Sequence, residues 1–203
     1  MRRGKELIAT DIDEVIFPFV EQFIEWHNRE YGTSLTAEDF HTYEFGDVID
    51  EPISEIVHRV ELFVNQEHSH IDVAPIESAQ AVIQEMSDDF DFLGLTARHP
   101  DFRITTKQYI EHYFRSLIPE IVLVGHKETV SIVRSKVDVC RSFGAAALVD
   151  DSIHHTAECA DTKVQGILFG EYPWNRGAET PQGVIRCANW REVQEYAYST
   201  AAW

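Results

Sequence analysis

The stretch "LIATDIDEVIFPF", residues 7–19, decides the fold, because a short apolar run leads directly into two aspartates. Asp11 and Asp13 are separated by one residue, and the chain turns apolar again after them. Charged side chains are rarely buried without a partner. Two carboxylates at the end of a predicted buried strand therefore indicate a site where positive groups face them.

Other short apolar runs, each bounded by turn or charged residues, predict further buried strands. The predicted strands cover residues 7–10, 90–95, 121–124, 146–149 and 165–169. Helical patterns separate the later strands. This alternation predicts an α/β fold whose mainly parallel sheet is covered by helices on both faces.

Residues that favour helix ends mark the predicted helices. We expect Thr105 or Thr106 to cap "TKQYIEHYF", Ser135 to cap "KVDVCRSFG" with Gly144 as its stop, and Asn189 to cap "WREVQEYAY".

The first two predicted strands are separated by about 80 residues, too many for a simple crossover. Two helical stripes lie in this gap, and "TAED" at 36–39 resembles a capping box. We therefore predict a small helical cap over residues 18–74, inserted into a core made of residues 1–17 and 75–203.

In parallel α/β sheets, ligands bind where strands end, at the carboxyl edge. The polar residues expected there are Asp11, Asp13, Thr96, Asp150 and Asp151, with Lys136 opening the helix before the fourth strand. Carboxylates gathered without thiolates favour a hard, oxygen-seeking ion, and Mg²⁺ is the leading candidate. One carboxylate can attack phosphorus and a second can act as general acid, which predicts phosphate-ester chemistry.

The histidines offer a weaker alternative, a transition-metal site. His68 and His70 form an H-x-H pair, and His154 and His155 are adjacent. No second ligand pair at helical spacing accompanies them, so we do not favour zinc.

The ordered motifs resemble those of the haloacid dehalogenase superfamily of Asp-nucleophile phosphatases. They are "DIDEV" from Asp11, Thr96 after an apolar strand, Lys136, and "VDDS" at residues 149–152. The resemblance covers essentially the whole chain and implies a Rossmann-like core with a cap after the first strand. Within that superfamily, "GILFGEYPWNRG" and "NWREV" look like the 5′(3′)-deoxyribonucleotidase family.

The resemblance implies a role for each acid. Asp11 would be the nucleophile and Asp13 the general acid/base. Asp11, the main-chain carbonyl of Asp13 and one acid of the Asp150–Asp151 pair would hold Mg²⁺. We favour Asp151 as the direct ligand, with Asp150 bracing the site.

The same resemblance places Thr96 and Lys136 against the phosphoryl group, with Lys127 as an alternative to Lys136. One residue departs from the pattern: Glu14 stands where the family usually has Gly.

The composition limits the partners. The 17 Lys and Arg against 35 Asp and Glu give a net charge of −18, which argues against nucleic acid polymers and anionic membranes. Three distant cysteines fit a reducing cytoplasm, and no apolar run has the length of a signal peptide or membrane span.

We therefore expect a cytoplasmic, Mg²⁺-dependent phosphomonoesterase whose partner is a small phosphorylated metabolite, and we favour a nucleotide. Alternatives are a phosphatase for sugar phosphates or other small metabolites, and a non-catalytic phosphate-ligand-binding protein. The oligomeric state stays open. Phe17, Phe19, Trp26 and Trp174 are either ring-stacking residues at the site or part of the hydrophobic core.

Overall fold

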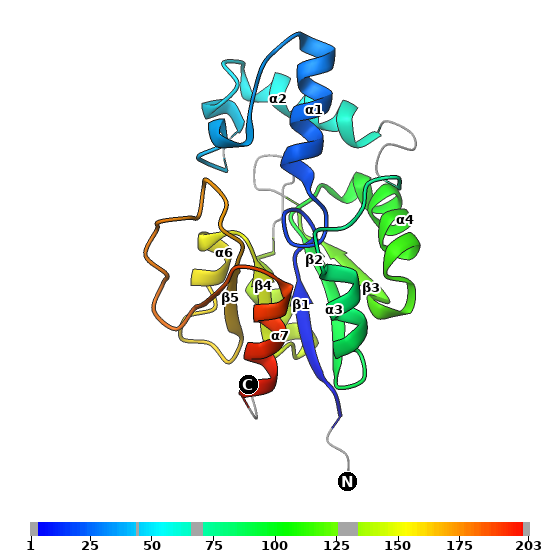
Figure 1. The fold of residues 1–203 in the computed structure, drawn as a ribbon, viewed down its shortest axis with the longest axis vertical. Helices are drawn as coiled ribbons and strands as arrows, with labels where there is room; N and C mark the ends of the chain where they lie inside the picture. The colour runs from blue at the N-terminus through cyan, green and yellow to red at the C-terminus, as the bar shows by residue number, and fades with distance from the viewer. Residues whose placement is uncertain (1–3, 44, 66–70, 126–133, 201–203) are drawn as a thin grey trace.

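The computed structural model describes residues 4–43, 45–65, 71–125 and 134–200. Within them, six parallel strands form one sheet in the order β3-β2-β1-β4-β5-β6 (Figure 1). The strands are β1 (Glu6–Thr10), β2 (Phe90–Thr96), β3 (Glu120–Leu123), β4 (Ala147–Asp150), β5 (Gln165–Phe169) and β6 (Ile185–Cys187). The predicted parallel α/β architecture is confirmed.

Strand register brings the predicted site residues to one edge of the sheet. Thr10, the last residue of β1, pairs with Gly94 of β2 and Val149 of β4. The backbone N–H of Asp11 then donates to the Val149 carbonyl at 2.8 Å. The chain therefore leaves β1, β2 and β4 at neighbouring points of the carboxyl edge.

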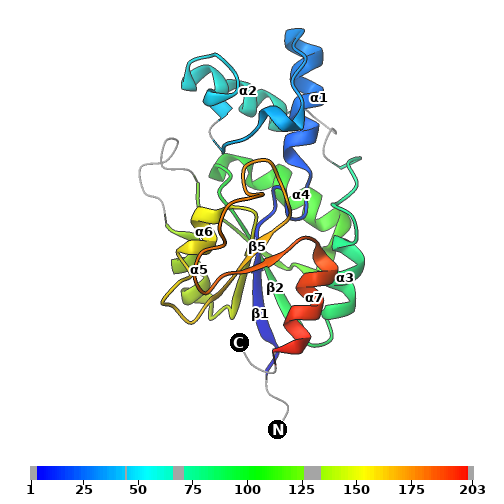
Figure 2. The same cartoon turned by 60° about the vertical axis from the view of Figure 1, so that its left-hand side comes forward.

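Helices cover both faces of the sheet, because successive strand residues point to opposite sides. Ile8 and Phe92 belong to the hydrophobic cluster that includes α3 (Ala79–Met86) and α7 (Trp190–Ser199). Ala9 and Leu93 belong to the other cluster, with α5 (Lys136–Phe143). Figure 2 shows α3 and α7 on one side of the sheet and α5 with α6 (Ile153–Ala157) on the other.

Three of the predicted helix boundaries are confirmed. The Ser135 side chain accepts the Asp138 N–H at the start of α5, and Gly144 ends this helix in the left-handed conformation. Asn189 caps α7 by accepting the N–H groups of Arg191 and Glu192.

The predicted start of α4 (Arg103–Tyr113) is wrong, because the helical run begins before Thr105. A 3₁₀ turn over Pro100–Phe102 leads directly into α4, and the His99 side chain accepts the Asp101 N–H at its start. Proline at the first position of a helical turn favours this earlier start. Thr105 and Thr106 therefore lie inside the helix.

The segment predicted as a cap contains two long helices, α1 (Phe19–Tyr31) and α2 (Ile53–Asn65), and two 3₁₀ turns, Ala37–Asp39 and Phe45–Asp47. In Figure 1, α1 and α2 lie beyond the carboxyl edge of the sheet. The "TAED" capping box is present at the first 3₁₀ turn. The division of the chain into cap and core stays a prediction.

The aromatic residues that enter this segment are part of its packing. Phe17, Phe19 and Trp26 are all buried within the larger hydrophobic cluster. The Phe19 ring lies edge-on to Phe63 of α2 at 5.3 Å between centroids. These contacts hold α1 against α2, which favours the core interpretation of the three side chains over ring stacking at the site.

None of the helices in the described part of the chain is both long enough and apolar enough to span a membrane. Cys140, Cys159 and Cys187 are buried and free of disulfide bonds.

Candidate active site

Asp11 lies directly after β1 and is 7% exposed. Its Oδ1 accepts the backbone N–H of Ile12 at 2.7 Å, and its Oδ2 lies 2.8 Å from Nζ of Lys136. Burial raises the pKa of Asp11 to about 7, although Lys136 acts in the opposite direction. The carboxylate is thus held in a fixed orientation at a place where a cation stabilises its charge.

Lys136 is the first residue of α5 and is 1% exposed. Its ammonium lies between two carboxylates, with 2.8 Å to Oδ2 of Asp11 and 2.7 Å to Oδ2 of Asp150. Burial alone would lower the pKa of Lys136, but the two aspartates outweigh it and raise the pKa. Lys136 therefore stays charged. Lys127, the alternative cation, lies outside the described residues.

Asp150 ends β4 with both carboxylate oxygens engaged by protein groups. Oδ1 accepts the Ser152 N–H at 2.9 Å and lies 3.2 Å from Nδ1 of His155, while Oδ2 pairs with Lys136. Burial alone would raise the pKa of Asp150, but Lys136 outweighs it and lowers the pKa. The side chain is braced as an anion.

Asp151, the next residue, has fewer partners. Its Oδ2 accepts the indole N–H of Trp174 at 2.8 Å. Burial, followed by the neighbouring charge of Asp150, raises the pKa of Asp151 well above its usual range. Lys136 only partly opposes this rise, and Asp151 forms no ion pair with the described residues.

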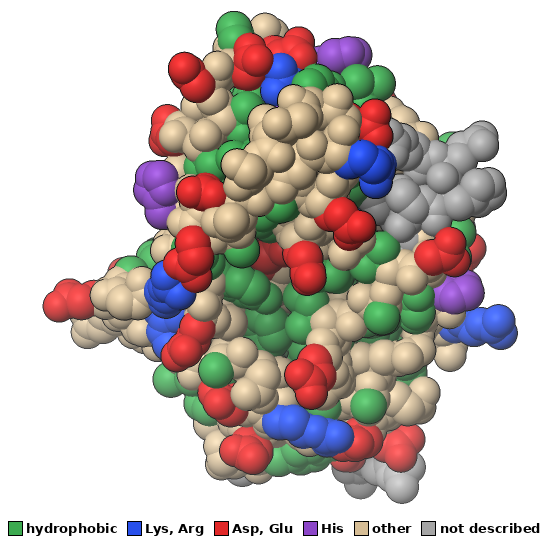
Figure 3. Space-filling model, turned by 45° about the horizontal axis from the view of Figure 1, so that its top comes forward, with side chains coloured by type: hydrophobic (Ala, Val, Ile, Leu, Met, Phe, Trp, Pro, Cys, Tyr) green, Lys and Arg blue, Asp and Glu red, His purple; other side chains and the backbone are tan. Residues whose placement is uncertain are grey.

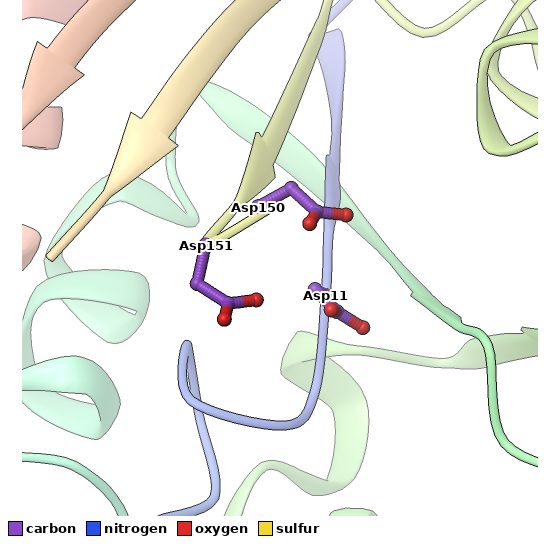
Figure 4. Close-up of side chains that lie close together, drawn as sticks. All are labelled: Asp11, Asp150 and Asp151. Atoms are coloured by element: carbon purple, nitrogen blue, oxygen red, sulfur yellow. The ribbon is translucent and has the colours of Figure 1, made fainter. Parts of the chain in front are cut away.

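Asp11, Asp150 and Asp151 each offer an oxygen, and these oxygens lie within 4.8 Å of one another. Figure 4 shows the three side chains meeting where β1 and β4 end. One ammonium cannot neutralise three buried carboxylates. Burial raises the pKa values of Asp11 and Asp151, and Lys136 only partly opposes this rise. The donor set, all oxygen and all anionic, fits a hard divalent cation.

Asp13 lies across the loop from Asp11, in a tight turn closed by a backbone bridge to Phe17. Its carboxylate forms a two-point ion pair with Arg98, with Nη2 to Oδ1 at 2.6 Å and Nε to Oδ2 at 2.9 Å. Its side chain is 27% exposed, so Asp13 is the most accessible of the site carboxylates.

Thr96 ends β2 and is 1% exposed. Its hydroxyl oxygen accepts the backbone N–H of Arg98 at 3.2 Å. The residue lies on the strand next to β1. Thr96 therefore ends its strand at the same edge of the sheet as Asp11.

Glu14 adopts a left-handed backbone conformation, with φ of 60°. Glycine reaches this region at little cost, whereas a residue with a Cβ is strained there. The Glu14 carboxylate accepts the backbone N–H of Val20, in the first turn of α1, at 2.9 Å. Burial, followed by the charge of Asp151, raises the pKa of Glu14 well above its usual range.

Three aromatic side chains gather beside Asp151. The rings of Tyr172 and Trp174 are stacked with 4.9 Å between centroids, and Tyr43 lies 5.8 Å from Trp174. The Tyr43 hydroxyl donates to the main-chain carbonyl of Asp151, so the predicted cap contacts the acid cluster directly.

Trp174 and Tyr172 also line a cavity of about 750 Å³, together with Glu14 and the segments around Pro18 and Pro75. Figure 3 shows a hollowed face of the molecule where hydrophobic side chains line the hollow and acidic side chains stand around it. The predicted catalytic and phosphate-binding residues are not among the cavity's lining residues. The cavity therefore adjoins the acid cluster through Trp174.

Several site residues were missed by sequence reasoning. Arg98 carried a signal, as the first cation after the end of β2, in "TARHP". Tyr43 contacts Asp151 across 108 positions of the chain, and no local pattern marks such a contact. His155 was considered only as a metal ligand, and its ring instead lies against Asp150.

Comparison with known proteins identifies one family. The model of the family described as "5′ nucleotidase, deoxy (Pyrimidine), cytosolic type C protein" matches residues 5–201. A comparison with curated protein sequences gives no significant match.

Many solved structures share the fold. A haloacid dehalogenase-like hydrolase from Streptococcus pneumoniae superposes with a TM-score of 0.64 at 12% identity, covering 97% of this chain and 99% of the other. A magnesium-bound hydrolase of the same superfamily from Bacillus subtilis gives 0.59 at 11% identity, with 96% and 99% covered. CbbY from Rhodobacter sphaeroides, in complex with phosphate, gives 0.62 at 14% identity, with 93% and 96% covered.

Proposed function

Because the chain belongs to the family of 5′ nucleotidase, deoxy (pyrimidine), cytosolic type C proteins, in the haloacid dehalogenase superfamily of phosphatases, we propose that it hydrolyses nucleoside 5′-monophosphates. The family match over residues 5–201 is the observation that carries the choice of substrate class. The reaction is the cleavage of a phosphate monoester by an aspartate nucleophile, with Mg²⁺ as cofactor.

Asp11 is the proposed nucleophile. A carboxylate oxygen of Asp11 attacks phosphorus, and the bond from phosphorus to the ester oxygen breaks. Asp13 gives a proton to the departing oxygen, which leaves as a free hydroxyl. A water molecule then attacks the aspartyl-phosphate and gives its proton to Asp13, releasing phosphate and restoring both carboxyl groups.

Lys136 and Thr96 are the proposed partners of the phosphoryl group. The buried Lys136 ammonium is already 2.8 Å from Asp11, so it lies beside any phosphorus that Asp11 attacks. A fixed positive charge at this position stabilises the extra negative charge of the transition state. The Thr96 hydroxyl, at the edge of the neighbouring strand, supplies a hydrogen bond.

The proposed Mg²⁺ ligands are Asp11, Asp151 and the main-chain carbonyl of Asp13. Asp150 takes the bracing role, because both of its oxygens already bond to Lys136, Ser152 or His155. The bound ion would neutralise the acid cluster and polarise the phosphate ester.

The aromatic cluster supports a nucleotide as the substrate. Tyr43, Tyr172 and Trp174 lie next to Asp151, where a ring attached to the phosphate can contact them. Aromatic faces stack favourably on nucleobases. The net charge of −18 favours such a small substrate over a nucleic acid polymer.

The test is a substrate panel read by the release of inorganic phosphate. After EDTA treatment and dialysis, the enzyme is assayed with and without Mg²⁺ on deoxyribonucleoside and ribonucleoside monophosphates, sugar phosphates and p-nitrophenyl phosphate. We expect Mg²⁺-dependent hydrolysis and the highest kcat/KM on a nucleoside monophosphate, with Asp11→Asn as the inactive control.

Two results would contradict the proposal. A sugar phosphate that exceeds every nucleotide in kcat/KM would remove the nucleotide assignment. Full activity after exhaustive chelation would contradict the proposed requirement for Mg²⁺.

A further inference from the structure

We propose that Arg98 is the positioning residue for Asp13, fixing the position and the plane of its carboxylate for the proposed reaction. The inference rests on the proposed function, because it concerns the general acid/base of that reaction. Its ground is the two-point contact between the Arg98 guanidinium and the Asp13 carboxylate.

The contact has the fork geometry that restrains a carboxylate most strongly. Nε of Arg98 donates to Oδ2 at 2.9 Å, and Nη2 donates to Oδ1 at 2.6 Å. Two parallel bonds fix both the position and the plane of the carboxylate, whereas a single bond would allow it to rotate. Asp13 is partly exposed and would otherwise sample several rotamers.

Arg98 is itself held from several sides. Its side chain is 7% exposed, and its Nη1 donates to the Thr106 hydroxyl of α4 at 3.1 Å. Its guanidinium lies over the rings of Phe17 and Phe19, at 5.3 and 5.8 Å from their centroids. The positioning group is therefore anchored to α4 and to the start of α1.

The two carboxylate oxygens are not equivalent in this arrangement. Oδ1 accepts two bonds from Arg98, from Nη2 at 2.6 Å and from Nε at 3.2 Å, whereas Oδ2 accepts one, from Nε. Each carboxylate oxygen accepts about two hydrogen bonds. Among the described residues, Oδ2 therefore accepts one hydrogen bond fewer than Oδ1.

In the reaction, the Asp13 carboxyl group gives its proton to the ester oxygen as the bond from that oxygen to phosphorus breaks. The Asp13 carboxylate that results stays paired with Arg98. In the second half, the Asp13 carboxylate takes a proton from the water that attacks the aspartyl-phosphate, so no other proton donor is required.

The experiment compares Arg98→Gln and Arg98→Lys with wild type on aryl phosphates whose leaving phenols differ in acidity. The value of kcat/KM reports the steps up to release of the phenol, which needs less protonation as the phenol becomes more acidic. For Arg98→Gln we expect a loss on the order of 100-fold with phenyl phosphate, and only about threefold with 2,4-dinitrophenyl phosphate.

The dependence of kcat/KM on phenol acidity therefore becomes steeper in Arg98→Gln than in wild type. Arg98→Lys, which retains the charge but not the fork, should be intermediate. The inhibition constant of inorganic phosphate should stay within about twofold of wild type, because uniform binding is not affected. Arg103→Gln, at an exposed arginine on α4, is the matched control.

Thr106→Val provides a second route if the Arg98 variants do not fold. It removes the 3.1 Å anchor of Arg98 and should steepen the same dependence to a smaller degree. An equal loss on all esters, no loss, or a gain in activity in the folded variants would overturn the inference. Absence of hydrolysis by the wild-type enzyme would instead contradict the proposed function.

Discussion

The ammonium of Lys136 lies 2.8 Å from the carboxylate of Asp11, and both side chains are almost completely buried. The same ammonium lies 2.7 Å from Asp150, so one cation serves two carboxylates from two strands. Removing one partner of a buried ion pair leaves an uncompensated charge. We therefore expect that loss of the Lys136 ammonium would destabilise the folded protein.

Lys136→Met should lower the free energy of unfolding by about 3–5 kcal/mol, because Asp11 and Asp150 lose their shared counter-charge. Urea denaturation at neutral pH measures this change. Lys107→Met is the control, since Lys107 is exposed and pairs with Glu111 only at the surface, and it should change the free energy by less than about 1 kcal/mol. Equal effects of the two substitutions would show that the buried contact is not stabilising.

Glu14→Gln should stabilise the metal-free protein at high pH. Burial raises the pKa of Glu14 in the folded state, so the folded protein binds a proton that the unfolded chain has lost. The contribution of Glu14 to stability is therefore fully present at pH values below its ordinary pKa of 4.5. This contribution is lost as the pH rises towards the raised pKa of the folded state. Glutamine keeps an acceptor for the Val20 N–H and carries no charge.

Thermal unfolding in EDTA measures this effect. The gain in Tm of Glu14→Gln over wild type should be clear near pH 8 and should vanish near about pH 4, where both chains are neutral at this position. Glu21→Gln removes a charge from an exposed position of α1 and should show no such dependence. A gain for Glu14→Gln that is independent of pH would contradict the burial argument.

His27, in the segment predicted as a cap, should make the stability of the protein depend on pH. Arg59 can only donate, so its contact with Nε2 at 3.1 Å places the ring proton on Nδ1, which donates to the Thr33 hydroxyl at 2.9 Å. Burial, followed by the charge of Arg59, lowers the pKa of His27 below 6.5. The neutral ring is therefore favoured by the folded state.

As pH falls below 6.5, the unfolded chain binds a proton that folded His27 resists, and stability decreases. His27→Gln should reduce the loss of stability between about pH 7 and about pH 5.5, measured by urea denaturation at both values. His58→Gln, at an exposed histidine of α2, should leave the loss unchanged. An identical loss in His27→Gln and wild type would contradict this role.

Strong local patterns made most of the fold predictable. The strands that end at Thr10 and Thr96 are short apolar runs with clear boundaries. The ends of α5 were predictable because the Ser135 side chain can cap a helix start and Gly144, which has no side chain, readily adopts the left-handed conformation that ends a helix. β6 was missed because three residues with Arg186 at their centre form too short and too polar a run.

The part of the candidate site that is formed by residues at strand ends was predictable from the sequence. Asp11 and Asp150 come together because β1 and β4 are neighbours in a parallel sheet. The partner of Asp13 was not predictable, since Arg98 reaches it across 85 positions. The left-handed backbone conformation of Glu14 was also not predictable, because glutamate, unlike glycine, does not favour this conformation.

The proposed roles of Asp11 and Asp13 make unlike predictions for two similar substitutions. Asp11→Asn should abolish turnover and leave no phosphoenzyme, because an amide is a poor nucleophile. Asp13→Asn should lose turnover by about 10²–10⁴-fold, since it cannot transfer the proton, yet its main-chain carbonyl is unchanged. With an activated ester, which needs little protonation, Asp13→Asn should still form the aspartyl-phosphate and then stall.

Intact-protein mass spectrometry of both variants, quenched rapidly after mixing with 2,4-dinitrophenyl phosphate and Mg²⁺, tests these roles most directly. We predict one added phosphoryl group on Asp13→Asn and none on Asp11→Asn, with peptide mapping placing the adduct at Asp11. A phosphoryl adduct on Asp11→Asn, or wild-type turnover by Asp13→Asn, would contradict the assignment.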